Sequence, residues 1–290
     1  MDCKPQLAAD AAPDVRWPSW LPVFFINRDC DGERRQRIEG ELAKAHLAGE
    51  RVKAADGLAV DPGLRPYFFN GDRLASKLSP GEVGCYASHL SISQLILQRG
   101  VDHALVLEDD AVLPANLGAI MLDLLDKLPW DWDLVHLCQD PTHAIKPVAR
   151  LMQSRLLVRY SRVPPSTVGY LIRRSGAKKF LAPGLRLWPV DTDLRQPWQF
   201  EMSVYGVAPK VIAHADDLHS AVLAFGERSR LRRGMRRPAA NYPVGNPLHT
   251  SHGAFYNFRT LGPLWWAHCW WQNTLRRLRM KMGGRSRPAL

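Results

Sequence analysis

The stretch VDHALVLEDDAVLP, residues 101–114, decides how the rest of the chain is interpreted. Its apolar run, residues 104–107, has the composition of a strand that is buried on both faces. Three carboxylates, Glu108, Asp109 and Asp110, follow directly, at the point where such a strand would leave the core. Because ligands bind at the carboxyl ends of strands in open α/β sheets, this acidic run is the first candidate for a functional site.

Three adjacent acids repel one another, so their place at a strand end requires a compensating cation or a partly neutralised carboxyl. Glu108 and Asp110 are two residues apart and point the same way in extended backbone. Hard oxygen donors in this arrangement suit Mg²⁺ or Mn²⁺, which in turn suits a diphosphate. The alternative is a solvated acidic turn that caps the next helix, and the residues alone leave both interpretations open.

The charge of the chain is concentrated at one end. The 290 residues carry a formal net charge of +11, yet residues 226–290 contain 13 Lys and Arg against one acid, Glu227. The preceding body is therefore close to neutral. A neutral body with a basic tail favours a surface anchor, so we expect no nucleic acid as partner.

Neither the cysteines nor the hydropathy indicates an extracellular or membrane-spanning protein. Residues 1–14 lack the apolar core of a secretory signal, and no apolar run reaches the roughly 20 residues that span a bilayer. We therefore expect a reducing cytoplasm. The five cysteines show no paired spacing that would indicate a zinc knuckle or a disulfide framework: Cys3, Cys30, Cys85, Cys138 and Cys269.

Apolar runs alternate with amphipathic segments, which predicts an α/β domain with a mostly parallel central sheet. Residues 1–20 are expected to form a poorly ordered arm, residues 21–225 the domain, and residues 226–290 a basic, Trp-rich extension, with 238–260 loop-like. Expected strands lie at 23–26, 51–55, 104–107, 134–137 and 166–172, with a closing pair over 204–213; expected helices lie at 33–48, from 80 onward, at 115–128 and, N-capped by Ser175, at 176–181.

The helix expected after Ser79 carries a further group of side chains that could bind a metal or act in catalysis. Ser79, Pro80 and Glu82 form the pattern of a capping box. Glu82, Cys85 and His89 share one stripe of this helix, at spacings of three and four. Because capping already explains Glu82, and because a free Cys or a lone His is usually part of a core, this stripe is a weak candidate for a metal or nucleophile site.

The order and spacing of several motifs resemble glycosyltransferase family 25, the lipopolysaccharide and lipooligosaccharide galactosyl- and glucosyltransferases. The resemblance covers residues 21–225, and Arg28 departs from it, because the family usually has Leu there. The matching residues are Asn27 with Arg34 and Arg37, Ala55-Asp56-Gly57, Gly81 to His89, Val106 to Asp110, Gly169 to Ile172 with Gly176-Ala177, Pro189-Val190-Asp191 and Val207-Ala208-Pro209.

The resemblance implies a GT-A-like nucleotide-sugar-binding fold, a UDP-galactose or UDP-glucose donor, and inversion at the anomeric carbon. Asp110, with Glu108 or Asp109 beside it, would hold Mn²⁺ or Mg²⁺ at the donor diphosphate. Contacts to the donor nucleotide are expected from Asn27, Arg34 and Asp56, with Glu108 and Asp109 also at the donor site.

Inversion requires a carboxylate that takes the proton of the acceptor hydroxyl. Asp191 is the first candidate for this base and Asp193 the second. A turn residue or an additional metal ligand remains an equal alternative for Asp191.

The acceptor implied by the resemblance is a lipopolysaccharide or lipooligosaccharide core or a related glycolipid, made at the inner face of the cytoplasmic membrane. Four tryptophans, two at 265–266 and two at 270–271, precede a basic segment with Arg276, Arg277 and Arg279. This composition predicts peripheral binding to an anionic membrane surface, and the alternative is that the tryptophans pack on the body.

Two other classes of function remain open. A metal-dependent nucleotide-sugar hydrolase could use the same acids, with water in place of the acceptor. A non-catalytic membrane- or nucleic-acid-binding protein could use the basic tail, although the neutral body argues against it.

Overall fold

The computed structural model describes Trp17, residues 20–215 and residues 247–283. The expected N-terminal arm and the Arg-rich segment after residue 226 thus lie mostly outside the described residues. The strands are β1 (Val23–Asn27), β2 (Glu50–Lys53), β3 (Phe69–Asn70), β4 (Arg73–Leu74), β5 (His103–Glu108), β6 (Ala111–Val112), β7 (Leu134–His136), β8 (Ile145–Arg150), β9 (Leu156–Tyr160), β10 (Gly169–Arg173), β11 (Val204–Ala208) and β12 (Ala213–His214).

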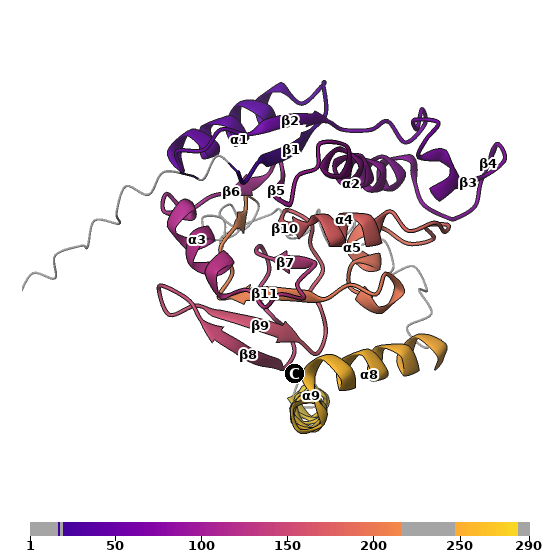
Figure 1. Ribbon diagram of the computed structural model, residues 1–290. Coiled ribbons are helices and arrows are strands. Elements are labelled where there is room, and N and C mark those ends of the chain that lie inside the picture. Colours follow the sequence, from indigo (N-terminus) through magenta and orange to yellow (C-terminus); the bar gives the residue numbers. More distant parts are fainter. Residues whose placement is uncertain (1–16, 18–19, 216–246, 284–290) are drawn as a thin grey trace, which may run out of the picture.

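The helices surround one central sheet. They are α1 (Gly32–Lys44), α2 (Pro80–Gln98), α3 (Leu117–Lys127), α4 (Arg174–Phe180), α5 (Val190–Asp193), α8 (Pro247–Leu261) and α9 (Pro263–Gly283), with short 3-10 turns η1 (Arg65–Tyr67) and η2 (Pro197–Gln199). In Figure 1, α1 and α3 lie on one side of the sheet and α2, α4 and α5 on the other.

The central sheet has eight strands in the order β2-β1-β5-β10-β7-β11-β9-β8. β10 runs antiparallel to both of its neighbours, β5 and β7, and β9 runs antiparallel to β11 and β8. The other six strands share one direction, so the sheet is mostly parallel, as the alternating sequence pattern predicts. The acidic run follows β5, which lies in the interior of the sheet.

Successive side chains of a strand point to opposite faces, and this alternation divides the core in two. Phe24 and Val106 pack with α2 and α4, whereas Phe25 and Leu107 pack with α1 and α3. All four are almost completely buried. Burial on both faces explains why the strand sequences are continuous apolar runs, and it fixes the carboxyl ends of β1 and β5 side by side.

The capping box at the start of α2 is confirmed. The Ser79 hydroxyl accepts from the Glu82 amide, and the Glu82 carboxylate accepts from the Ser79 amide at 2.7 Å. The cap expected at α4 is wrong: α4 begins at Arg174, and the Ser175 hydroxyl donates instead to the Asp133 carboxylate at 2.6 Å. Asp133 is buried and its carboxylate needs hydrogen-bond donors, so the Ser175 hydroxyl donates to it and does not cap the helix.

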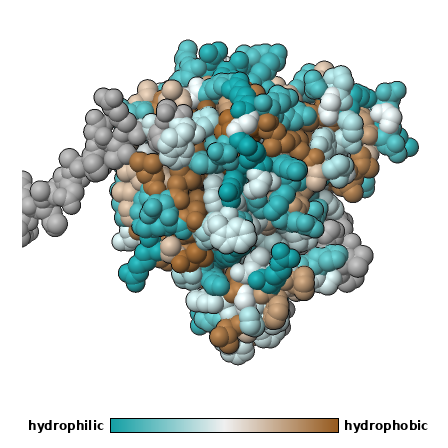
Figure 2. Space-filling model, viewed as in Figure 1, coloured by the Kyte–Doolittle hydropathy of each residue, from teal (hydrophilic) through white to brown (hydrophobic). Residues whose placement is uncertain are grey.

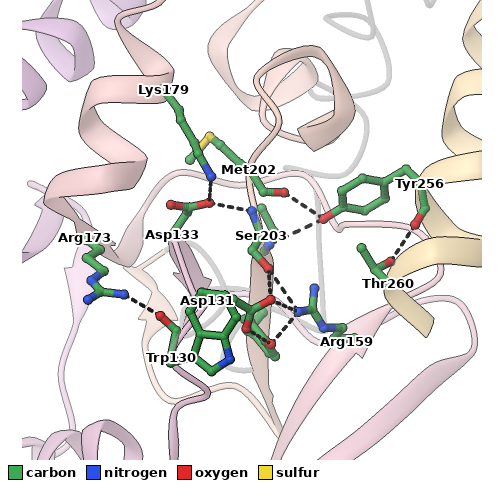
Figure 3. A network of polar contacts seen from close by, with 12 residues as sticks. Trp130, Asp131, Asp133, Arg159, Arg173, Lys179, Met202, Ser203, Tyr256 and Thr260 are labelled. Carbon is green, nitrogen blue, oxygen red and sulfur yellow. Dashed lines mark hydrogen bonds and ion pairs between the residues drawn. The ribbon is translucent and has the colours of Figure 1, made fainter. Parts of the chain in front are cut away.

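The C-terminal segment differs from the expected loop over 238–260, because residues 247–261 form α8 and α9 follows almost directly. Figure 3 shows one anchor of α8: the Tyr256 hydroxyl donates to the Met202 carbonyl at 2.9 Å, within a polar network that includes Asp131, Asp133 and Arg159. Helix α8 is therefore attached to the body. Among the described helices, none combines the length and apolarity needed to cross a bilayer.

Candidate active site

Asp109 is the most buried of the three acids that follow β5. It accepts from the Asn27 amide at 2.8 Å and forms an ion pair with Arg34 at 2.9 Å, while its backbone carbonyl accepts from Arg37 at 3.0 Å. These contacts join the carboxyl ends of β1 and β5 to the first turns of α1. The interactions of Asp109 are therefore structural, because they fix the positions of β1, β5 and α1 around the site.

Asp110 is the acid with a carboxylate oxygen that accepts no hydrogen bond from the described residues. One carboxylate oxygen lies 2.6 Å from Arg34 and 3.1 Å from Nε2 of His214, whereas Oδ1 is buried without a hydrogen-bond partner among the described residues. Burial, and next the charge of Glu108, raise the pKa of Asp110. A buried carboxylate oxygen without a partner is costly, so this atom is suited to a cation.

Glu108 lies at the last position of β5 and faces α2. It accepts from the Thr167 hydroxyl, and His89 Nε2 lies 3.4 Å from its Oε1. Burial acts to raise the pKa of Glu108, but hydrogen bonding and charge from His89, together with Thr167, outweigh it, and the pKa lies below its ordinary value. Glu108 is therefore a carboxylate at neutral pH.

The charge compensation that the sequence requires comes from the protein itself. Arg34 contacts both Asp109 and Asp110, and its side chain is 43% exposed. His214 reaches Asp110 because β12 pairs with β6, directly after the acidic run. The exposed part of Arg34 leaves a guanidinium face available to a phosphate.

The Ala55-Asp56-Gly57 motif packs against the first turns of α2. A Cβ on Gly57 would lie 1.8 Å from the Pro80 carbonyl oxygen, and a Cβ on Gly84 would lie 2.5 Å from the Ala55 carbonyl oxygen. The Ala55 amide donates to the Ser88 hydroxyl at 2.9 Å. The two glycines permit this backbone contact, which holds Asp56 at the carboxyl end of β2, exposed to solvent.

Asn27 lies at the end of β1 but is almost completely buried. Its amide nitrogen donates to Asp109 and to the Asp31 carbonyl, and its amide oxygen accepts from Arg51 at 3.0 Å. These contacts give Asn27 a positioning role beside the acids. A direct contact between Asn27 and a nucleotide stays a prediction.

Asp191 and Asp193 lie on α5, which begins directly after Pro189. Asp193 is buried and accepts from the Tyr86 hydroxyl at 3.0 Å, and burial raises its pKa to about 7. Asp191 is only partly buried. The charges of Glu108, Asp191 and Asp110 all raise the pKa of the Cys85 thiol, after burial.

Cys85, His89 and Glu108 offer ligand atoms within 4.8 Å of one another, which is the geometry of a metal site. However, burial, and next the charge of Glu108, raise the pKa of the Cys85 thiol to about 12. His89 is fully buried, and its Nδ1 lies 2.9 Å from the Tyr170 hydroxyl. A thiol is a soft ligand that suits Zn²⁺ rather than Mg²⁺ or Mn²⁺, so this set fits the cation expected at a diphosphate less well than the oxygen donors beside it.

By donor chemistry the candidate for a divalent cation is Asp110, with Glu108 two residues before it and the imidazole of His214 3.1 Å from its carboxylate. The unpartnered Oδ1 of Asp110 supplies the structural evidence. Carboxylate oxygens and an imidazole suit Mn²⁺, and carboxylates alone suit Mg²⁺. His214 is a residue that sequence reasoning leaves out of the ligand set, because its segment matches the family only loosely.

A cavity of about 1650 Å³ lies at the amino ends of β5, β7 and β11, the opposite end of the strands from the acidic run. Its central acids are already paired, Asp131 with Arg159 at 2.7 Å and Asp133 with Lys179 at 2.6 Å (Figure 3). These pairs link β9 and α4 to the segment that precedes β7. The cavity is thus separate from the acidic run, and its acids have structural partners.

A mostly parallel α/β sheet that carries carboxylates at the end of an interior strand has the arrangement of a ligand-binding α/β protein. Residues 21–194 match the family described as "Glycosyltransferase family 25 (LPS biosynthesis protein)". The chain belongs to glycosyltransferase family 25. Its α/β architecture agrees with the expected GT-A-like fold.

Several relatives are similar to more than half of the chain. Human procollagen galactosyltransferase 2 is 28% identical over 193 residues, which cover 58% of this chain and 29% of the relative. Human inactive glycosyltransferase 25 family member 3 is 31% identical over 188 residues, which cover 58% and 30%. The chain thus matches less than a third of these relatives' length, and one of them is named inactive.

One solved structure is also similar, a glycosyltransferase involved in the glycosylation of the major capsid of PBCV-1. It has 10% sequence identity and a TM-score of 0.37, and the match covers 74% of this chain and 99% of that one.

Proposed function

We propose that this protein is an inverting glycosyltransferase that moves a hexose, galactose or glucose, from a UDP-sugar to a glycan acceptor of the lipopolysaccharide or lipooligosaccharide core type. The observation that carries the proposal is the acidic run at the end of β5, where Asp110 keeps a buried oxygen without a partner. The family supports glycosyl transfer, and human procollagen galactosyltransferase 2 is among the similar relatives.

Asp110 and Glu108, with His214, would hold Mn²⁺ or Mg²⁺ at the donor diphosphate. When bound, the cation supplies charge neutralisation of the departing UDP. Arg34 adds a fixed positive charge at the same place, because its guanidinium bridges Asp109 and Asp110 while part of it stays exposed. Asp56, held at the end of β2 by the packing of Gly57, would contact the nucleotide.

Asp191 is proposed as the base that accepts the proton of the acceptor hydroxyl. It is partly exposed and lies at the start of a short helix, and its charge acts on the same Cys85 thiol as the charges of Glu108 and Asp110. Asp193 is buried and bonded to Tyr86, so it suits a positioning role for α5 better than direct contact with an acceptor.

The decisive experiment incubates the protein with Mn²⁺ and a panel of UDP-hexoses and measures UDP release with and without a core oligosaccharide. We expect release from UDP-galactose or UDP-glucose that depends on the acceptor, and a product whose anomeric configuration, read by proton NMR, is inverted. Release unchanged by any acceptor would favour a nucleotide-sugar hydrolase. No release and no donor binding by calorimetry would overturn the transferase assignment.

A further inference from the structure

Asn273 attaches helix α9 to the body. Its amide oxygen accepts from the Ala144 amide at 2.9 Å, and its amide nitrogen donates to the Ser161 hydroxyl at 3.0 Å. Cys269, about one turn earlier on the same face, is 1% exposed. The helix is thus fixed against the residues that precede β8 and follow β9, at the edge of the sheet (Figure 1).

Two arginines of α9 lie on the side of the helix that faces the body. Arg276 and Arg277 are three and four residues after Asn273, and residues at these spacings are neighbours on a helix surface. Both arginines are exposed. In Figure 2, hydrophilic residues lie at the surface of the end of the molecule where Figure 1 places α8 and α9. These guanidinium groups are therefore open to solvent beside the junction of α9 with the body.

Two arginines of the body lie at the same junction. Arg162 directly follows Ser161, the hydrogen-bond partner of Asn273. Arg195 reaches this segment because its Nε donates to the Val163 carbonyl at 3.3 Å. Both arginines are exposed. We refer to the four residues together as the arginine cluster: Arg162, Arg195, Arg276 and Arg277.

The imidazole of His143, which directly precedes Ala144, also lies near these charges. Burial, and next the charges of Arg162, Arg276, Arg277 and Arg195, lower the pKa of His143 to about 4. Burial, and then the charges of Arg277 and Arg195, likewise lower the pKa of Arg162. The four positive charges therefore lie near one another, in agreement with the hydrogen bonds at the junction.

The arginine cluster has no acidic partner among the residues that the structure describes. Elsewhere on the body arginines are paired, as Arg159 is with Asp131, whereas no ion pair of the described residues includes a member of the cluster. Positive charges that are held close together without acids repel one another and attract anions. The junction is therefore suited to an anionic ligand.

The cluster also lies next to α5, the helix that carries Asp191. Arg195 is four residues after Asp191 and two residues beyond the end of this helix. Because Asp191 is the proposed base, the reacting hydroxyl of the acceptor has to reach α5. Another part of the same acceptor can then contact Arg195 and its neighbours in the cluster.

We propose that the arginine cluster binds an anionic substituent of the acceptor glycan, either a phosphate group or a sugar carboxylate. Both groups present paired oxygens that match the planar fork of a guanidinium. The proposal rests on the proposed function, because it places the acceptor at Asp191. The cluster thus favours acceptors that carry negative charge and holds them beside α5.

The test measures binding of small charged sugars to the full-length protein by ligand-observed NMR, at low ionic strength and without donor or metal. The probes are glucose 6-phosphate and glucuronic acid, which separate phosphate from carboxylate, and glucose is the uncharged control. We expect at least one charged sugar to bind, more weakly at high salt, and glucose not to bind. Because this readout needs no turnover, it stays valid if the transferase assignment fails.

The variant Arg162→Gln with Arg277→Gln should weaken binding of the charged sugar about tenfold or more, because hydrogen bonds to a charged group are lost. It should melt at or slightly above the wild-type temperature, because both residues are exposed and their mutual repulsion is removed. Arg276→Gln alone is the milder variant. The matched control, Arg35→Gln with Arg73→Gln, removes the same charge from exposed positions of α1 and β4 and should bind as the wild type does.

Full binding of the charged sugar by the double variant would overturn the proposal, and so would equal binding of glucose or no binding of either charged sugar. Loss of binding in Arg34→Gln, with binding retained in the double variant, would place the sugar at the donor site instead. Co-sedimentation with phosphatidylglycerol vesicles that depends on the cluster, without binding of a charged sugar, would assign the cluster to a membrane surface.

Transfer kinetics separate this proposal from the proposed function. With an anionic acceptor that supports transfer, the Arg162 and Arg277 double variant should raise the KM of the acceptor about tenfold and leave the KM of the UDP-sugar unchanged. An unchanged acceptor KM in an enzyme that still transfers would overturn the role of the cluster and leave the transferase assignment intact.

Discussion

Gly57 lies against Pro80 so closely that a Cβ on Gly57 would stand 1.8 Å from the Pro80 carbonyl oxygen. The loop that carries Asp56 is thereby fixed to the first turn of α2, the helix whose second turn carries Cys85 and whose third carries His89. Gly84 makes the reciprocal contact with the Ala55 carbonyl. Because neither glycine has a side chain, the backbone of the Ala55-Asp56-Gly57 loop packs directly against the start of α2. This contact fixes the distance between the two sequence motifs.

Replacement of Gly84 by Ala should disturb this contact. The new Cβ would lie 2.5 Å from the Ala55 oxygen, so the loop or the helix has to shift, which we expect to cost about 1–3 kcal/mol of unfolding free energy. Chemical denaturation measures the cost. The control is Gly81→Ala on the same helix, which meets nothing within 4 Å and should be neutral or stabilising by up to about 1 kcal/mol. Equal effects of the two substitutions would contradict the close packing.

Asp110→Asn tests the cation site. It removes the charge beside the unpartnered Oδ1, so Mn²⁺ binding measured by calorimetry should fall at least tenfold, and transfer should fall by about 100-fold or more. Thermal stability should change little, because an amide oxygen can still accept from Arg34. The control is Asp72→Asn, whose side chain is fully exposed and whose ion pair with Arg65 is long at 3.3 Å. Unchanged Mn²⁺ affinity in the Asp110 variant would remove the metal assignment.

Asp191→Asn tests the base. Loss of a general base should lower turnover by about 10²–10⁴-fold, while the affinity for the UDP-sugar changes little. Turnover and donor affinity are measured separately, by UDP release at saturating donor and by calorimetry. A large loss of donor affinity with turnover preserved at saturation would move Asp191 into the donor or metal site.

Asp193 gives a prediction about pH. Because burial raises its folded pKa to about 7, above its value in the unfolded chain, the folded protein binds a proton that the unfolded protein has released between about pH 4 and 7. Its contribution to stability is therefore present below about pH 4 and is lost as the pH rises toward 7. The side chain of Asp193→Asn cannot ionise. The melting temperature of the variant, relative to that of the wild type, should therefore rise between about pH 4 and 7 and stay constant above about pH 7.

Melting curves at several pH values, recorded for both proteins, check this trend. The variant keeps an oxygen that can accept from Tyr86, so the hydrogen bond itself is retained. A difference in melting temperature that is constant between about pH 4 and 7 would show that Asp193 is ionised in the folded protein throughout this range and would contradict the prediction. Asp61→Asn, at an exposed loop position, serves as the reference for an acid without burial.

Much of the fold follows from local sequence patterns. The continuous apolar runs at β1 and β5, the capping box at Ser79 and the acids after residue 107 are encoded by neighbouring residues, and the structure confirms their elements. The family, too, is confirmed from motif order and spacing. α8 escaped prediction because its sequence contains Gly, Asn and two His, which are modest helix formers, and its stability comes from contacts such as that of Tyr256 with Met202.

The sequence alone determined that three carboxylates end a buried strand and that charge and tryptophan concentrate near the C-terminus. Only the tertiary structure decided what each residue does there. Asp109 became a structural acid because Asn27 and Arg34 converge on it, and His214 joined Asp110 because β12 returns to β6. Such assignments depend on partners distant along the chain, since burial and pairing, rather than residue type, set the charge and the availability of a carboxylate.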